Sequence, residues 1–254
     1  MILAMELAPG KISPETLRTL PALFSQKGET IHQARNHVKV IELDGILTVV
    51  KSFRPPNLFR RVGYALRGTT KAQISYENAL RLLELNIDTP EPLAYLVMKK
   101  EGKLLSYYLS RRYEYDFTLK PVLRDPSFPH REEILQSFGR FVALLHQKGI
   151  WHRDLSQGNL LIRKTLKGWS FALVDLNRIR FAPVSPKLGP KNFGKLWTDQ
   201  ETLRIILTTY ALDQKIDIHQ ALHQAISADR LTKRAKILRR RLQGKPIPSQ
   251  GALR

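Results

Sequence analysis

Residues 150–159 read Ile-Trp-His-Arg-Asp-Leu-Ser-Gln-Gly-Asn, and this stretch carries the most specific pattern in the chain. Asp154 comes first and Asn159 follows five positions later, with a loop that turns back between them. Such a loop places one carboxylate and one amide oxygen at the mouth of a cleft. A carboxylate can orient an attacking hydroxyl and accept its proton, whereas an amide oxygen can hold a magnesium ion on bound phosphates. The pattern therefore indicates phosphoryl transfer, with Asp154 as the base and Asn159 as a metal ligand.

The order His-Arg-Asp followed by Asn is typical of the catalytic loop of the protein-kinase fold. In this loop, His152 is expected to brace the backbone rather than to exchange protons. A second pattern follows, because the apolar run at residues 171–174 ends in Asp175, where this fold supplies its main magnesium carboxylate. Leu176 and Asn177 come next, in place of the Phe-Gly pair of protein kinases. This difference argues against an ordinary protein kinase and leaves the metal role of Asp175 intact.

Two further charged residues are expected to anchor the nucleotide. Lys51 comes late in a β-branched strand, from which its ammonium can reach the α- and β-phosphates of ATP. Glu77 comes in the following helix, where its carboxylate can hold that lysine in place. Taken singly, a loop aspartate is usually a turn residue, and a lysine or glutamate is usually solvated. Their joint appearance, in the order strand Lys, helix Glu, catalytic loop and strand Asp, favours the catalytic interpretation.

A glycine-rich phosphate loop is missing between residues 27 and 40, where Gly28 is the only glycine. A turn through residues 34–36 is expected to cover the nucleotide instead. Arg35 is the expected phosphate donor in that turn, where its guanidinium replaces some of the backbone amides.

Hydrophobic patterning predicts a strand-rich first part and a mainly helical second part. The predicted hairpins pair residues 38–43 with 46–53, around Asp44-Gly45, and residues 93–98 with 104–109. Helices are predicted near residues 71–86, 131–147 and 198–242, short strands at 160–162 and 171–174, and a loop at 183–194. We therefore expect an α+β, protein-kinase-like fold. Its small β-rich lobe with one helix spans residues 1–115, and its larger helical lobe spans residues 116–254.

Composition limits the class of protein. The 254 residues suffice for one large domain or for two small lobes around a shared cleft. A hydrophobic fraction of 43% with 25% charged residues is typical of a soluble folded protein. The 42 Lys and Arg residues against 22 Asp and Glu give a net charge of +20, which attracts nucleic acid, anionic membranes and phosphorylated glycolipids.

The chain contains no cysteine, which excludes disulfides, thiolate metal sites and cysteine nucleophiles and fits a reducing compartment. Residues 1–6 lack the basic start of a signal peptide. Apolar runs in the sequence are all shorter than the ~20 residues that span a bilayer. We therefore expect a cytoplasmic protein whose contact with the inner membrane is peripheral.

These patterns resemble the lipopolysaccharide core kinases, which phosphorylate Kdo or heptose sugars of the inner core. The resemblance covers about residues 28–181 and rests on Lys51, the Asp154 loop and the stretches 28–30, 76–80, 86–92 and 174–178. Members of that family have a kinase-like fold and lack both the glycine-rich loop and the Phe-Gly pair.

The resemblance implies ATP and Mg²⁺ as cofactors and a hydroxyl of a lipid-linked sugar as the acceptor. It also implies Asp154 as the base, Asn159 and Asp175 as metal ligands, and Lys51 with Glu77 as the pair that anchors phosphate. The acceptor sugar, its hydroxyl and the oligomeric state stay open.

Residues 57–67 interleave arginine with phenylalanine, tyrosine and leucine. Such a segment can place apolar side chains among lipid headgroups while its arginines pair with phosphates, so an anionic membrane surface is an expected partner. The alternative is a linking loop with a solvated basic face, and the basic stretch at residues 233–241 leaves the same choice.

Two other functions remain open on the sequence alone. One is a kinase that acts on another small molecule or on protein. The other is a basic pseudokinase that binds nucleic acid, which the charge suggests. We expect no nucleic-acid partner, because the metal and phosphate positions keep competent residue types and no aromatic stacking motif of single-strand binders is present.

Overall fold

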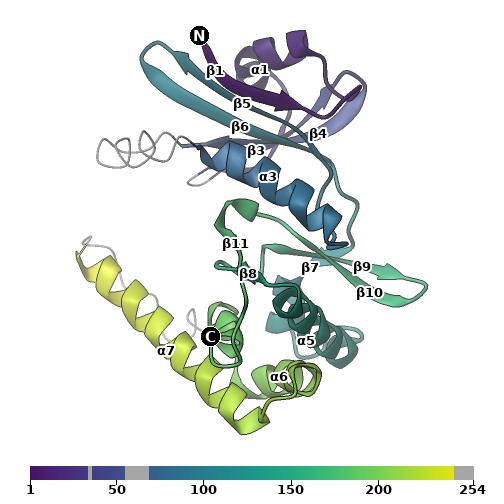
Figure 1. The fold of residues 1–254 in the computed structure, drawn as a ribbon, viewed down its shortest axis with the longest axis vertical. Helices are drawn as coiled ribbons and strands as arrows, with labels where there is room; N and C mark the ends of the chain where they lie inside the picture. The colour runs from purple at the N-terminus through teal and green to yellow at the C-terminus, as the bar shows by residue number, and fades with distance from the viewer. Residues whose placement is uncertain (34–35, 55–68, 243–254) are drawn as a thin grey trace. The chain divides into compact units, whose positions relative to one another are not determined.

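The computed structural model describes residues 1–33, 36–54 and 69–242, and the chain forms two compact units (Figure 1). Unit 1 comprises Met1–Glu114 and the short segment Asp175–Asn177, and unit 2 comprises Tyr115–Val174 and Arg178–Arg254. The sequence-based division between residues 115 and 116 differs from this one by a single residue and by the transfer of Asp175–Asn177 to unit 1.

Unit 1 is built on a six-stranded antiparallel sheet with the order β1-β5-β6-β4-β3-β2. Its strands are β1 (Ile2–Leu7), β2 (Glu29–Gln33), β3 (His37–Leu43), β4 (Ile46–Phe53), β5 (Pro92–Lys100) and β6 (Lys103–Arg111). Both predicted hairpins are confirmed. In the first, Asp44 and Gly45 have φ angles of 49° and 76°, and a two-residue type I′ turn requires positive φ at both positions.

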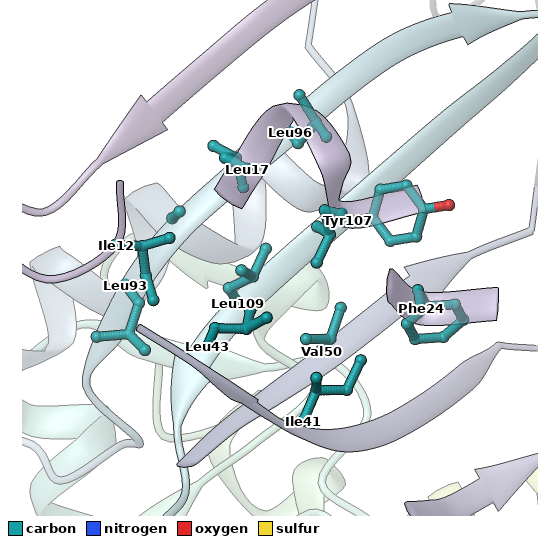
Figure 2. Close-up of a cluster of buried hydrophobic side chains, with 12 residues drawn as sticks. Ile12, Leu17, Phe24, Ile41, Leu43, Val50, Leu93, Leu96, Tyr107 and Leu109 are labelled. Atoms are coloured by element: carbon teal, nitrogen blue, oxygen red, sulfur yellow. The ribbon is translucent and has the colours of Figure 1, made fainter. Parts of the chain in front are cut away.

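Helix α1 (Pro14–Gln26) covers one face of this sheet. Ser13 caps the helix by accepting a 3.1 Å hydrogen bond from the backbone N–H of Thr16. Leu17, Leu20 and Phe24 of α1 belong to a buried cluster that also contains side chains of β3, β4, β5 and β6 (Figure 2). Burial of each such side chain contributes roughly 1.5–3 kcal/mol. The sequence analysis expected one helix in this part of the chain, and α1 corrects that expectation.

The second described helix of unit 1, α3 (Lys71–Glu84), packs on the other face of the sheet. Side chains of a strand alternate between faces, so the burial of Val50 beneath α1 directs Lys51 to the face of α3. On that face, Lys51 is in register with Tyr108, which is in register with Tyr95. Tyr95 contacts Tyr76 of α3, with ring centroids 5.5 Å apart. The sheet register therefore places the predicted nucleotide-anchoring lysine beside α3.

Unit 2 is mainly helical, and the α+β class with a helical second part is confirmed. Its helices are α4 (Leu119–Arg124), α5 (Arg131–Gln147), α6 (Gln200–Gln214) and α7 (Ile218–Leu242). Its strands are β7 (Phe117–Thr118), β9 (Leu160–Thr165) and β10 (Gly168–Leu173) in one sheet, and β8 (Ile150–His152) and β11 (Ile179–Phe181) in another. The predicted loop at residues 183–194 contains a 3-10 helix, η2 (Gly189–Lys195).

Helices α5 and α6 cross closely because Gly139 lies at their contact. A Cβ atom at Gly139 would lie 2.2 Å from the carbonyl oxygen of Ile206, which only a glycine avoids. Phe138 and Phe193 pack nearby, with ring centroids 6.1 Å apart. Within the described residues, no helix has the length and apolar composition needed to cross a membrane.

Candidate active site

Lys51 of β4 forms an ion pair with Asp175, a residue 124 positions later in the chain. The two side chains are partly buried, at 17% and 23% exposed, so solvent screens their attraction less than it would at the surface. The ammonium of Lys51 also lies 5.2 Å from the ring centroid of Phe53. Lys51 is thus fixed between an aromatic ring and the carboxylate that the sequence predicts to hold magnesium.

Asp175 begins a short turn that packs within unit 1. Its φ of 59° is left-handed, a conformation that Asp tolerates better than most residues. Asn177 donates a 2.8 Å hydrogen bond from Nδ2 to Oδ1 of Asp175, the same oxygen that Lys51 contacts. Asn78 of α3 donates from Nδ2 to the carbonyl oxygen of Leu176 at 2.8 Å. The turn is therefore tied to both β4 and α3, and this orients the carboxylate.

The expected ion pair between Lys51 and Glu77 is not among those that the described residues form. Glu77 instead accepts a 2.9 Å hydrogen bond from Nε2 of Gln73, one turn earlier in α3. Burial raises the pKa of Tyr95, with further contributions from the charges of Glu6 and Glu77. Glu77 is an exposed residue of α3 that bonds to Gln73, and Lys51 pairs with Asp175 instead.

The catalytic loop of unit 2 is closed by its own hydrogen bonds. His152 is fully buried, and its Nδ1 accepts from the backbone N–H of Asp154 at 3.2 Å. Because Nδ1 is the acceptor, Nε2 carries the proton and donates to the carbonyl oxygen of Val174 at 3.1 Å. Nδ2 of Asn159 donates to the carbonyl oxygen of Asp154 at 2.9 Å. These bonds confirm that His152 braces the loop.

A buried polar network supports this loop from behind. Asn192 of η2 donates from Nδ2 to the carbonyl oxygen of His152 at 2.9 Å, so its Oδ1 accepts from Nε2 of His146 at 3.1 Å. Nδ1 of His146 then accepts from the hydroxyl of Tyr210 at 2.9 Å. Burial lowers the pKa of His146 to about 4, which the hydrogen bond to Asn192 partly opposes. The network therefore holds a neutral imidazole, and sequence analysis missed it.

The carboxylate of Asp154 pairs with two cations that sequence analysis did not select as site residues. Nη1 of Arg178 lies 2.7 Å from Oδ2, and Nζ of Lys195 lies 3.4 Å from Oδ1. Arg178 ends the Asp-Leu-Asn-Arg stretch and was visible in the sequence as part of it. Lys195 follows a Pro/Gly-rich segment and carried no sequence signal.

The predicted metal ligands have the chemistry that magnesium prefers. The amide N–H₂ of Asn159 makes the contact with Asp154, and its Oδ1 receives no hydrogen bond from any described residue. Asp175 supplies a carboxylate held in a fixed orientation. Among the described residues, no three His, Asp or Glu side chains gather as a metal site. A carboxylate oxygen and an amide oxygen are each a ligand type that suits magnesium, which commonly keeps waters and substrate phosphates as its other ligands. Arg35 lies outside the described residues.

Comparisons with known proteins place this site in a family context. The family model described as lipopolysaccharide kinase (Kdo/WaaP) family matches residues 57–204, which include Glu77, Asp154, Asn159 and Asp175 but not Lys51. A solved structure of WaaP in complex with acyl carrier protein superposes with a TM-score of 0.60 at 16% identity. The superposition covers 92% of this chain and 98% of the WaaP chain, which shows a shared fold.

Curated relatives in two organisms carry the name 3-deoxy-D-manno-octulosonic acid kinase. The protein from Vibrio parahaemolyticus is 25% identical over 145 residues, which cover 55% of this chain and 59% of the relative. The protein from Haemophilus influenzae is 28% identical over 122 residues, which cover 46% of this chain and 49% of the relative. The chain thus spans about half the length of these relatives. Because the family model matches more than half of its residues, the chain belongs to the lipopolysaccharide kinase (Kdo/WaaP) family.

Proposed function

We propose that this protein is a magnesium-dependent kinase that transfers the γ-phosphoryl group of ATP to a hydroxyl of a sugar in the lipopolysaccharide inner core. The observation that carries the proposal is the ion pair between Lys51 and Asp175. Sequence patterns had assigned these residues separately to phosphate anchoring and to metal binding. A basic and an acidic group that meet across 124 residues supply the two charges that phosphoryl transfer requires at the donor.

In the proposed reaction, the acceptor hydroxyl gives its proton to Asp154 while its oxygen forms a bond to the γ-phosphorus. The bond between that phosphorus and the oxygen that bridges it to the β-phosphate breaks, and its electron pair leaves with ADP. Lys51 binds the α- and β-phosphates, and Asp175 and Asn159 would hold magnesium. When bound, magnesium would neutralise part of the charge on the phosphates. Arg35 remains a candidate phosphate donor. Glu77 bonds to Gln73 in the structure, so its support of Lys51 is proposed only for the nucleotide-bound protein.

The acceptor that we propose is 3-deoxy-D-manno-octulosonic acid (Kdo), because the curated relatives in both organisms carry its name. Heptose is the second candidate within the family. The decisive experiment incubates the purified protein with ATP, magnesium and Kdo-lipid A and measures the product by mass spectrometry. We expect a gain of about 80 daltons, the mass of one phosphoryl group.

Two controls make this experiment specific. Asp154→Ala should abolish the mass gain, and a heptose-extended acceptor tests the second sugar. Phosphorylation of soluble acceptors or protein, with none of Kdo-lipid A, would reject the proposed substrate and favour a different kinase. If the protein fails to bind ATP both with and without magnesium and binds RNA tightly, the kinase function is rejected in favour of nucleic-acid binding.

We further propose that the protein works at the cytoplasmic face of the inner membrane as a peripheral protein. The net charge of +20 supports this, because each basic residue near an anionic surface contributes about 1 kcal/mol. Binding to anionic liposomes should weaken as salt rises, and neutral liposomes should bind poorly. Salt-independent binding to both would contradict the proposal. The predicted membrane segment at residues 57–67 lies outside the described residues.

Because WaaP was solved with acyl carrier protein, a protein of that kind is a proposed additional partner.

A further inference from the structure

Two basic side chains flank the carboxylate of Asp154 on separate oxygens. Arg178 contacts Oδ2 at 2.7 Å and Lys195 contacts Oδ1 at 3.4 Å. The side chain of Arg178 is 46% exposed, that of Lys195 is 35% exposed and that of Asp154 is 25% exposed, so a ligand can reach all of them. Two cations and one carboxylate leave one net positive charge at the position where the acceptor hydroxyl must bind. A single cation would neutralise Asp154, so the second adds a positive charge that this carboxylate does not balance.

Lys195 is anchored by the packing of η2 on the catalytic loop. Its ammonium donates to the carbonyl oxygen of Arg153 at 2.5 Å, and Nε2 of Gln157 donates to the carbonyl oxygen of Leu196 at 2.6 Å. On its other side, η2 packs tightly against α7. A Cβ atom at Gly194 would lie 2.7 Å from Cβ of Ala228. Its contacts with the carbonyl oxygen of Arg153 and with Asp154 already order the ammonium, so a ligand that binds it has little further side-chain entropy to remove.

Arg178 is anchored in a similar way. Its carbonyl oxygen accepts a 3.2 Å hydrogen bond from the backbone N–H of Arg153. The next residue, Ile179, is in register with His152 through the pairing of β11 with β8. The backbone positions of Arg178 and Asp154 are therefore linked through the same short sheet. The guanidinium uses Nη1 for Asp154, and its planar fork has further N–H donors that can bind a ligand carboxylate.

We propose that Arg178 and Lys195 form an acceptor-anion subsite that binds the carboxylate of a sugar acid while Asp154 engages its hydroxyl. The inference rests on the proposed kinase function and deepens it, because it selects an acidic sugar over a neutral one. A sugar acid brings one negative charge to a site with one net positive charge. A neutral heptose leaves that charge unmatched. The name of the curated relatives describes such an acid, 3-deoxy-D-manno-octulosonic acid.

The test compares an acidic acceptor with its neutral counterpart in steady-state kinetics with ATP and magnesium. The acceptors are Kdo-lipid A and the same molecule with the Kdo carboxylate converted to a carboxamide. The variants are Arg178→Gln and Lys195→Met. Matched controls are Arg180→Gln, an exposed arginine of β11 two residues after Arg178, and Lys191→Met, an exposed lysine of η2. Both controls should behave as wild type.

We expect Arg178→Gln to raise the KM for the acidic acceptor about 10- to 100-fold, as loss of a charge-assisted hydrogen bond predicts. Lys195→Met should raise it about tenfold, because its contact is longer. For the wild type, the carboxamide acceptor should have a KM raised by a similar factor. For Arg178→Gln, the carboxamide should raise the KM little further, because the arginine that binds the carboxylate is already absent. Arg178→Lys should recover part of the acid preference. Equal effects of the variants on both acceptors would overturn the subsite.

A fall in kcat at unchanged acceptor KM would also overturn it, because the cations would then act on the transferred phosphoryl group. Direct binding of free Kdo and of its carboxamide, measured by calorimetry without nucleotide, separates this inference from the proposed function. A preference for the acid that depends on Arg178 supports the subsite even if no phosphoryl transfer is detected. No preference for the acid in this measurement overturns the subsite even if phosphoryl transfer is observed.

Discussion

The carboxylates of Asp175 in unit 1 and Asp154 in unit 2 are both ion-paired, but their surroundings differ. Asp175 pairs with Lys51, whose side chain is 17% exposed, and the turn that carries it is tied to α3 and β4. Asp154 pairs with the more exposed Arg178 and Lys195, while its backbone N–H bonds to a fully buried neutral imidazole. In unit 1 a charge pair positions the carboxylate. In unit 2 a neutral network positions the loop and leaves the charges open to a ligand.

This difference matches the two chemical tasks proposed for the carboxylates. A group that holds metal and phosphate benefits from a fixed cation close by, because both act on the same phosphate charge. A group that accepts a proton from an incoming hydroxyl must stay reachable, and its neighbouring cations are then available to the acceptor.

The largest effect is expected from Asp154→Ala. Loss of the proton acceptor should reduce phosphoryl transfer about 10²- to 10⁴-fold and leave ATP binding in place, because Asp154 acts on the acceptor. Transfer rates and ATP affinity, measured separately, check this prediction. Asp213→Ala removes an exposed carboxylate of α6 and serves as the matched control. Wild-type turnover by Asp154→Ala would remove Asp154 from the mechanism.

A second prediction concerns the neutral network behind the Asp154 loop. His146 has a folded-state pKa of about 4 against 6.5 in the unfolded chain, so between these values the unfolded state binds more protons. Stability is therefore fully present above pH 6.5 and falls as pH drops towards 4, by roughly 3 kcal/mol from this group.

Tryptophan fluorescence during urea unfolding measures this effect in unit 2, because Trp151, Trp169 and Trp197 all lie there. His146→Gln should be less stable at pH 7 but should lose less stability than wild type on acidification. Parallel pH profiles of the two proteins would contradict a neutral buried His146.

A smaller effect is expected at the other carboxylate. Asp175→Asn should weaken magnesium-dependent nucleotide binding about 10- to 100-fold, because a neutral amide is a poorer ligand for a hard cation. Asp154→Asn should leave the same affinity nearly unchanged. Nucleotide titrations with magnesium and with excess chelator check both statements. An affinity that depends on neither magnesium nor Asp175 would make that residue structural.

The smallest effect distinguishes the two acidic partners considered for Lys51. In double-mutant cycles of unfolding free energy, Lys51→Met and Asp175→Asn should couple by about 1 kcal/mol, because the side chains touch in the folded protein. Lys51→Met and Glu77→Gln should be additive, because Glu77 bonds to Gln73 instead. Coupling of Lys51 to Glu77 alone would favour the pair expected from the sequence.

Local patterns in the sequence were sufficient for several elements. Turn residues at positive φ and alternating strands located both hairpins, and helical spacing located α5 within its observed bounds, Arg131–Gln147. Helix α1 was missed although Ser13, Pro14 and Leu17 carried its start signals, because Pro21 interrupts its pattern. These features depend on residues a few positions apart, so their energetics are visible in a short window.

By itself, the sequence determined the family resemblance, the α+β class and the Asp154 loop, because residues 150–159 contain all the spacing that such a loop needs. Only the tertiary structure decided which charges meet. Sheet register brought Lys51 to Asp175 rather than to Glu77, and the docking of η2 brought Lys195 to Asp154. Contacts between distant residues depend on register and helix packing, and on competition between several possible partners. No local pattern records the outcome of that competition.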